Sequence, residues 1–280
     1  MATSGAEIQL RLGGEGPPLV LLHGYPQTHA IWHRMAPTLA ERFTVVCPDL
    51  RGYGDSSKPP GGGDHSTYAK RALARDVVEV MEALGFLRFA AAGHDRGGRV
   101  LHRLALDHPQ RLTRAALLDI APTRAMYRRT DQAFATAYFH WFFLIQPYDL
   151  PERMIGADPD GWLQACLDRW GGDPAAFDPA AVAEYKRCFR EPAAIHASCE
   201  DYRAGASIDL AQDAADEKLL VECPLLVLWG ERGFVGRSLE PLALWRAVAE
   251  RVEGEALPCG HFLPEEAPEA TLAAFRAFFG

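Results

Sequence analysis

The sequence lacks the features that mark membrane, disulfide-stabilised and nucleic-acid-binding proteins. No stretch approaches the roughly 18 consecutive apolar residues that a membrane span requires. The 6 cysteines are scattered without a CxxC pair, which favours reduced thiols over a disulfide framework. The net charge is -8 and no basic stripe appears, so nucleic acid is not an expected partner. Residues 1–7 have neither the basic region nor the apolar core of a secretion signal, and we expect a cytoplasmic protein.

Histidine motifs typical of metal sites are also lacking. The 10 histidines form no pair that is combined with acidic residues at ligand spacing. His29 and His33 have the spacing of an HExxH motif but lack its glutamate. The sequence therefore predicts a protein without a metal centre.

The patterns that are present begin with alternating strand and helix signals. Residues 8–12 alternate with period two, as a half-buried strand does. Residues 69–84 carry apolar side chains at helical spacing and are followed by Gly85. Short continuous apolar runs, typical of buried parallel strands, lie at 19–22, 43–47, 89–92 and 115–118. These repeated units predict an α/β fold with a mostly parallel sheet and helices on both faces.

The pattern changes between residues 124 and 212. Strand signals disappear, and aromatic-rich helical segments follow at 134–145, 161–170 and 180–189. A buried-strand pattern returns at 224–230, and a weaker one lies at 254–257. We therefore expect a core of residues 1–123 and 213–280 with an inserted helical cap, or lid, of residues 124–212.

The most informative motif lies at residues 93–99, Gly-His-Asp-Arg-Gly-Gly-Arg. An apolar run meets a Gly-x-Asp-x-Gly turn that leads into a helix, which is the pattern of a nucleophile elbow with Asp95 in the place that serine often takes. A carboxylate there suits displacement at a saturated carbon, which gives an ester that water must hydrolyse. Arg96 and Arg99 in the same turn predict a substrate with its own carboxylate.

An elbow nucleophile needs a base, an acid that orients the base, and donors for an oxyanion. His261 lies in the expected loop near the end of the chain and is the candidate base. Asp119, directly after the apolar run at 115–118, is the candidate acid, with Glu231 as the alternative. The backbone N–H groups of Tyr25 and Arg96 are the candidate oxyanion donors.

These motifs resemble the α/β hydrolases whose nucleophile is aspartate, such as haloalkane dehalogenases and soluble epoxide hydrolases. Those enzymes often carry tryptophan directly after the nucleophile, where this chain has Arg96. The motif at 93–99 instead resembles the signature of the fluoroacetate (haloacetate) dehalogenases. The resemblance continues at 138–143, 199–205 and 260–266, and it spans essentially the whole chain.

The resemblance implies further site residues in the cap. His140, Trp141 and Tyr202 would donate hydrogen bonds to the departing halide, because a hard anion such as fluoride needs several donors in a dry site. Trp170 is a candidate for the pocket wall. Arg96 and Arg99 would hold the carboxylate of a small haloacid and place its α-carbon in line with Asp95.

The resemblance therefore implies hydrolysis of fluoroacetate to glycolate and fluoride without a cofactor, and a homodimer, as is common in that family. The preference between fluoride and chloride stays open, as does the range of 2-substituted acids. The first alternative is a soluble epoxide hydrolase, in which two cap tyrosines would protonate the epoxide oxygen. The candidates for that role are Tyr127, Tyr138, Tyr148, Tyr185 and Tyr202. The second is a binding protein without activity, which the complete set of Asp95, Asp119 and His261 disfavours.

Overall fold

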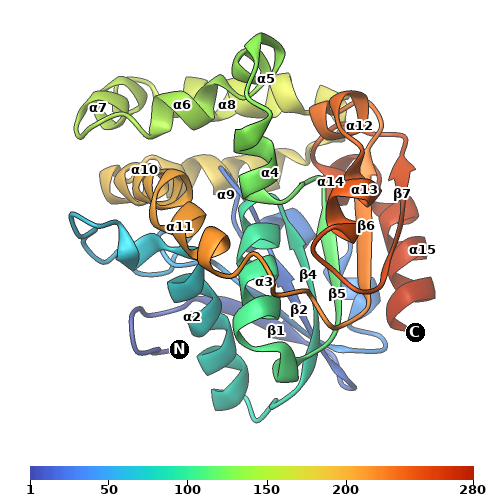
Figure 1. Cartoon of the computed structure of the whole chain (residues 1–280). Helices are drawn as coiled ribbons and strands as arrows, with labels where there is room; N and C mark the ends of the chain where they lie inside the picture. Colours follow the sequence, from blue (N-terminus) through green and yellow to red (C-terminus); the bar gives the residue numbers. More distant parts are fainter.

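A computed structural model describes all residues from 1 to 280 and contains one seven-stranded sheet (Figure 1). The strand order is β1-β3-β2-β4-β5-β6-β7, and every neighbouring pair is parallel except β1 with β3. The strands are β1 Leu10–Gly13, β2 Pro18–Leu22, β3 Thr44–Pro48, β4 Phe89–His94, β5 Leu112–Leu118, β6 Leu225–Gly230 and β7 Val252–Leu257. The predicted mostly parallel α/β sheet is confirmed.

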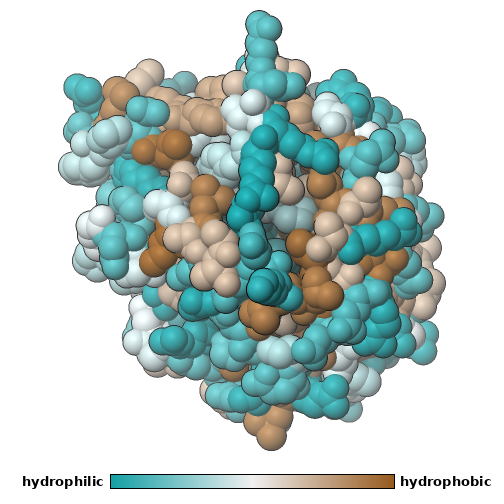
Figure 2. All heavy atoms as spheres, in the orientation of Figure 1, coloured by the Kyte–Doolittle hydropathy of each residue, from teal (hydrophilic) through white to brown (hydrophobic).

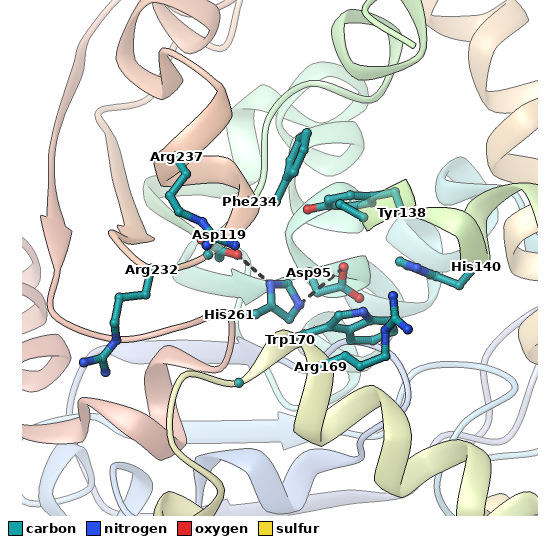
Figure 3. Close-up of a pocket in the computed structure, with 13 residues that line it drawn as sticks. Asp95, Asp119, Tyr138, His140, Arg169, Trp170, Arg232, Phe234, Arg237 and His261 are labelled. Carbon is teal, nitrogen blue, oxygen red and sulfur yellow. Dashed lines mark hydrogen bonds and ion pairs between the residues drawn. The ribbon is translucent and has the colours of Figure 1, made fainter. Parts of the chain in front are cut away.

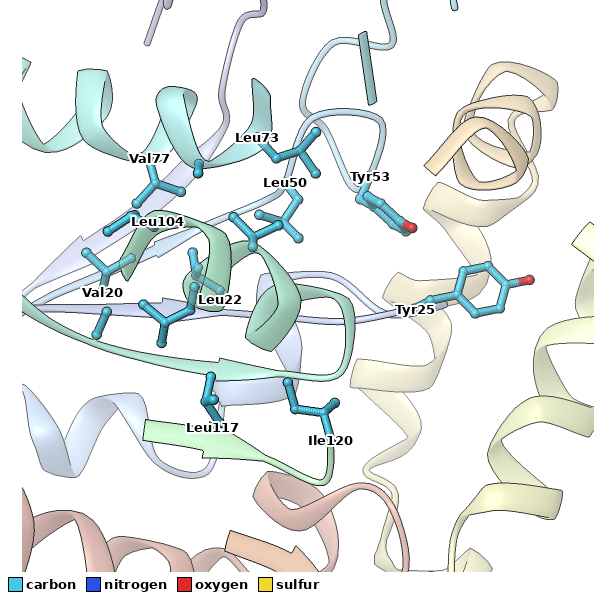
Figure 4. Packing of buried hydrophobic residues seen from close by; sticks show 14 of the residues in the cluster. Val20, Leu22, Tyr25, Leu50, Tyr53, Leu73, Val77, Leu104, Leu117 and Ile120 are labelled. Atoms are coloured by element: carbon cyan, nitrogen blue, oxygen red, sulfur yellow. The ribbon is translucent and has the colours of Figure 1, made fainter. Parts of the chain in front are cut away.

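Both faces of the sheet are covered, because successive strand residues point to opposite sides. On one face Val20 and Leu22 pack with Leu73 of α2 and Leu104 of α3 (Figure 4). On the other face Leu19 and Leu21 belong to a second cluster with the carboxyl-terminal helix α15. The core helices are α1 Ala36–Leu39, α2 Lys70–Ala83, α3 Arg96–Asp107, α12 Phe234–Ser238, α13 Pro241–Arg246, α14 Leu263–Glu266 and α15 Pro268–Phe279. Short 3-10 helices are η1 His29–Trp32, η2 Ser66–Tyr68 and η3 Pro109–Arg111.

Three strands begin at least two residues away from their sequence-based starts, and the largest difference is in β5, which begins at Leu112 and not at the predicted 115. β1 begins at Leu10, two residues later than predicted, and is exposed over most of its length. β7 begins at Val252, two residues earlier than predicted. Its residues Glu253 and Glu255 alternate with less exposed positions, which hides an edge strand from a search for apolar runs.

The segment between β5 and β6 contains helices and no strand, and it lies across the carboxyl end of the sheet (Figure 1). The predicted helical insertion is therefore confirmed, whereas its boundaries at 124 and 212 remain a prediction. Its elements are α4 Thr123–Arg128, α5 Gln132–Ala137, α6 Phe139–Leu144, α7 Leu150–Gly156, α8 Pro159–Trp170, η4 Pro174–Ala176, α9 Pro179–Phe189, α10 Pro192–Ala206 and α11 Ile208–Ala215.

One predicted cap helix is in fact two. The segment 134–145 breaks at Tyr138, which leaves the helical conformation at φ -104° and ψ 32°. The Tyr138 ring stacks on Phe134 at 5.0 Å and packs edge-on against Phe234 of α12 at 5.1 Å. This tertiary contact with the core accompanies the break, and no helix-breaking residue in the sequence signals it.

The surface contains hydrophilic and apolar side chains side by side (Figure 2). None of the helices combines the length and the apolar character needed to cross a bilayer. Four large apolar side chains of the cap are exposed: Phe139, Tyr148, Leu150 and Met154. The homodimer expected above stays a prediction.

Candidate active site

The turn between β4 and α3 places Asp95 in a rare backbone conformation. Its φ is 46° and its ψ is -116°, a backbone conformation that residues other than glycine seldom adopt. The turn requires glycines around it: a Cβ on Gly97 would lie 2.4 Å from the carbonyl oxygen of His23, and one on Gly24 would lie 2.5 Å from Cβ of Asp95. The Gly-x-Asp-x-Gly pattern thus forms the sharp elbow that the sequence predicts, and strain of this kind concentrates at functional sites.

The structure brings the predicted base and acid together beside this elbow (Figure 3). Nδ1 of His261 lies 2.6 Å from Oδ2 of Asp119, and Nε2 of the same ring lies 3.9 Å from Oδ2 of Asp95. The other oxygen of Asp119 accepts a hydrogen bond from the Gly230 N–H at 3.0 Å. The alternative acid, Glu231, is exposed and has no contact with His261. The geometry therefore favours Asp119 as the orienting group.

The charges in the site favour an ionised nucleophile and a basic imidazole. Burial raises the pKa of Asp95, but the nearby His261, His94, Arg96 and Arg99 outweigh it and hold this pKa below its usual value. For His261, burial lowers the pKa, but the hydrogen bond and the charge of Asp119 raise it above the usual value. Asp95 is therefore ionised at neutral pH, as a nucleophile would need to be.

One of the two predicted oxyanion donors contacts the carboxylate. The N–H of Tyr25 donates to Oδ1 of Asp95 at 3.0 Å, whereas the N–H of Arg96 makes no hydrogen bond to this carboxylate. Tyr25 is itself held from the cap, because its hydroxyl accepts a hydrogen bond from the Trp162 indole at 2.5 Å. Oδ1 is thus oriented by the core backbone, and Oδ2 is the oxygen that faces His261.

Arg96 and Arg99 lie on the first turn of α3 but have opposite surroundings. Arg96 is buried, and its Nε donates to Oδ2 of Asp201 at 2.7 Å. Its Nη2 donates to the backbone and side-chain oxygens of Asp201. Among its nitrogens only Nη1 is left for a ligand. The sequence analysis assigned Arg96 to the substrate and did not foresee this partner in the cap.

Arg99 is 4% exposed and forms no ion pair with any carboxylate. Its Nη1 donates to the carbonyl oxygen of Ala121 at 3.1 Å and to the Thr123 hydroxyl at 2.8 Å. Its Nε has no hydrogen-bond partner. Burial and the charge of Arg96 lower its pKa. Asp95 is the carboxylate whose charge acts on Arg99, but no hydrogen bond joins the two side chains. A buried guanidinium that lacks a directly paired anion is costly, so Arg99 favours an anionic ligand beside Asp95.

The three predicted halide donors lie at different depths. His140 lines the cavity, and its Nδ1 is buried without a partner. Burial lowers the pKa of His140 to about 3, so the ring is neutral at pH 7. Tyr202 is buried 5.8 Å from the His140 ring, and Trp141 packs under the Arg99 guanidinium at 4.7 Å. Neither Trp141 nor Tyr202 is among the residues that line the cavity, and the same holds for Arg96 and Arg99.

The cavity above Asp95 has a volume of about 360 Å³ and opens between cap and core. Trp170 lines it, as predicted for a wall residue, together with Tyr138 from the cap and Phe234 from the core (Figure 3). Sequence reasoning did not assign three arginines of this lining: Arg169, Arg232 and Arg237. They are discussed below.

Comparison with known proteins gives the family. Residues 17–268 match the alpha/beta hydrolase fold family. A fluoroacetate dehalogenase from Burkholderia sp is 48% identical over 95% of this chain and 88% of its own length. A crystal structure of a protein from Nostoc sp PCC 7120, described as an alpha/beta hydrolase, superposes with a TM-score of 0.99 at 60% identity, covering 100% of this chain and 96% of that one.

The chain is an α/β hydrolase. A soluble epoxide hydrolase from Corynebacterium sp. (strain C12) is also similar, at 36% identity over 99% of this chain and 94% of its own length. The relatives of this α/β hydrolase thus carry two activities by name, and the surroundings of Asp95 must distinguish between them.

The α/β hydrolase holds Arg96 in a buried ion network that sequence reasoning missed. Asp201 of α10 binds Arg96, and it also forms an ion pair with Lys70 of α2 and accepts a hydrogen bond from the Tyr53 hydroxyl at 2.7 Å. These charges lower the pKa of Asp201 strongly, although burial alone would raise it. The sequence offered one hint that Asp201 belongs to the site, because this residue directly precedes Tyr202 inside the motif at 199–205.

A second missed residue organises the loop of His261. The carboxylate of Glu266 accepts backbone hydrogen bonds from Gly260 at 2.9 Å, from Phe262 at 2.9 Å, and from Gly172 of the cap at 2.7 Å. The N–H of His261 itself donates to the carbonyl oxygen of Trp170 at 2.9 Å. The base loop of this α/β hydrolase is therefore anchored to the end of α8.

The one group of side chains with metal-ligand geometry lies away from the cavity. It consists of Asp55, Glu184 and Cys188. Arg187 already pairs with both carboxylates, at 2.7 and 2.8 Å. These residues are an ordinary surface ion pair, and they offer nothing to the chemistry at Asp95.

Proposed function

We propose that this α/β hydrolase is a haloacetate dehalogenase, with fluoroacetate as its foremost substrate. The observation that carries the proposal is Arg99, a buried guanidinium next to Asp95 that has no acidic partner. A substrate carboxylate would compensate this charge, whereas a neutral epoxide would leave it uncompensated. The 48% identity to a fluoroacetate dehalogenase supports the same assignment.

In the first step, the substrate carboxylate lies against Nε of Arg99 and Nη1 of Arg96. This contact orients the α-carbon toward Oδ2 of Asp95, because Oδ1 is held by the Tyr25 N–H. Oδ2 attacks the carbon, the carbon–halogen bond breaks, and the halide leaves with the bonding electron pair. The neutral His140 ring, the Trp141 indole N–H and the Tyr202 hydroxyl donate hydrogen bonds to the halide.

In the second step, His261 takes a proton from water, and the hydroxide attacks Cγ of the Asp95 ester. Charge develops on Oδ1, where the Tyr25 N–H already donates. Asp119 stabilises the imidazolium through the contact at 2.6 Å. The alkoxide leaves and is protonated as glycolate, and the Asp95 carboxylate returns after one proton passes to solvent. No step requires a cofactor.

The second candidate function is epoxide hydrolysis with the same nucleophile. Tyr138 favours it, because this residue lines the cavity and Tyr202 lies behind the wall near His140. Two phenol hydroxyl groups on the cap side could donate protons to an epoxide oxygen, although burial raises the pKa of both. Epoxide hydrolysis gives the buried guanidinium of Arg99 no role, because an epoxide carries no charge.

The test measures fluoride release from fluoroacetate with an ion-selective electrode, in parallel with chloride release from chloroacetate and diol formation from styrene oxide. We expect fluoride release, and we expect Asp95→Asn to abolish it. Diol formation without halide release would overturn the proposed function. Turnover that survives in Asp95→Asn would overturn the assignment of the nucleophile.

A further inference from the structure

Three exposed arginines from separate parts of the chain line the same cavity as Asp95. Arg169 lies in the last turn of α8 in the cap, Arg232 follows β6, and Arg237 lies in the last turn of α12. Cap and core therefore both contribute positive charge to the opening between them (Figure 3).

None of these three guanidinium groups forms an ion pair. Arg169 instead lies over the Phe139 ring at 5.2 Å, and the Glu266 carboxylate near Arg232 accepts backbone hydrogen bonds. The last turn of a helix does favour a cation. That effect does not explain Arg232, which lies in a loop, nor why residues from three separate segments without an ion pair line one cavity from different sides (Figure 3).

The charge of Arg169 reaches the interior. The pKa of His140 is lowered first by burial, and the charges of His261, Arg96 and Arg169 contribute to the same shift. An incoming anion approaches a chain of net charge -8 and a cavity with Asp95 and Asp119 at its floor. Charges of one sign at the opening of a low-dielectric cavity focus the field and concentrate the oppositely charged ligand.

We propose that Arg169, Arg232 and Arg237 together make the opening of the cavity an outer anion subsite, whose positive potential attracts the carboxylate of an organic acid before it reaches Arg99. The inference rests on the proposed function only in taking the substrate as an anion. The outer subsite touches no reacting atom, so it acts on capture and not on the chemical steps. It would favour carboxylates over neutral haloalkanes and epoxides that fit the same cavity.

The test replaces all three residues together, Arg169→Gln, Arg232→Gln and Arg237→Gln. The matched control is Arg153→Gln, Arg246→Gln and Arg276→Gln, which removes the same charge from exposed arginines that do not line the cavity. We expect kcat/KM for fluoroacetate to fall about tenfold at low ionic strength in the cavity variant, with kcat unchanged. We expect the difference in kcat/KM between the cavity variant and the wild type to shrink at about 0.5 M salt, because the Debye length is then only a few ångströms. The control variant should keep at least half of the wild-type value.

A binding measurement separates failure of this proposal from failure of the proposed function. Acetate is titrated into each protein, and isothermal titration calorimetry measures its affinity for the cavity. Weaker, less salt-dependent acetate binding in the cavity variant supports the outer subsite even if the wild type releases no halide. Equal acetate affinity and equal kcat/KM in the cavity and control variants would overturn it.

Discussion

The core and the cap contribute different kinds of residues to the surroundings of the cavity. The core side carries Asp95, Asp119 and His261, whose positions follow from the ends of neighbouring parallel strands. The cap side carries His140 and Tyr202, and it holds Arg96 through Asp201. Under the proposed function, the core side carries the covalent chemistry and also binds the substrate carboxylate through Arg96 and Arg99 of α3, whereas the cap side binds the leaving halide and positions Arg96. This difference predicts that the nucleophile and the recognition of the leaving group are specified by separate parts of the chain.

The largest effect should come from separating the two steps on the core side. In His261→Gln, Asp95 can still displace halide, but the ester has no base for its hydrolysis. We expect steady-state kcat to fall by roughly 10⁴-fold, while each active site releases one halide in a burst. Mass spectrometry of the intact protein should show the carboxymethyl group added to Asp95. A variant that shows neither burst nor adduct would refute the assignment of His261 to the second step alone.

Arg96 and Arg99 should separate stability from substrate binding. Arg96→Met leaves the buried Asp201 with Lys70 as its only cation, and we expect it to cost about 3 kcal/mol of unfolding free energy. Arg99→Met leaves no carboxylate unpaired, and we expect a loss of only about 1 kcal/mol. Urea unfolding measures both values.

The same pair should show the reverse order in kinetics. Arg99→Met should raise KM for fluoroacetate by about 100-fold, which corresponds to one lost contact between charged groups. Turnover of any neutral substrate should be unaffected. An Arg99→Met enzyme with an unchanged KM would contradict the assignment of Arg99 to the substrate carboxylate.

A smaller effect should come from the leaving-group side. Tyr202→Phe removes one hydroxyl from a buried aromatic cluster and changes little else. Fluoride is the harder halide to expel, so we expect kcat to fall about 30-fold for fluoroacetate and clearly less for chloroacetate. Equal losses for both substrates would mean that Tyr202 positions the site and does not bind the halide.

The pH dependence should differ between the two steps. Asp95 has a lowered pKa and stays ionised, so single-turnover halide release should be flat above about pH 5. His261 has a raised pKa and accepts a proton only when neutral. Ester hydrolysis should therefore increase with pH and level off above the usual histidine value of about 6.5. Rapid-quench measurement of halide release and of ester hydrolysis between about pH 5 and about pH 9 tests this difference in pH dependence.

The core side was predictable because its residues sit in short motifs. Glycines 93 and 97 permit only a sharp turn at Asp95, and Asp119 follows an apolar run directly. The cap side was less predictable because its contacts join distant segments. Tyr138 breaks a helix against Phe234, and Asp201 reaches Arg96 across 105 positions. No local pattern encodes such pairs, so the cap residues came from resemblance, and Asp201 was missed.

The bonds that Glu266 and Trp170 make with the loop of His261 determine how the protein can move. The N–H groups of Gly172 and Gly260 both donate to Oε2 of Glu266. The end of α8 and the loop of His261 are therefore tied to each other and should move together. A swing of the whole cap would carry His261 away from Asp95 and interrupt the second step. Under the proposed function, we therefore expect glycolate to leave through the arginine-lined opening while the cap stays in place.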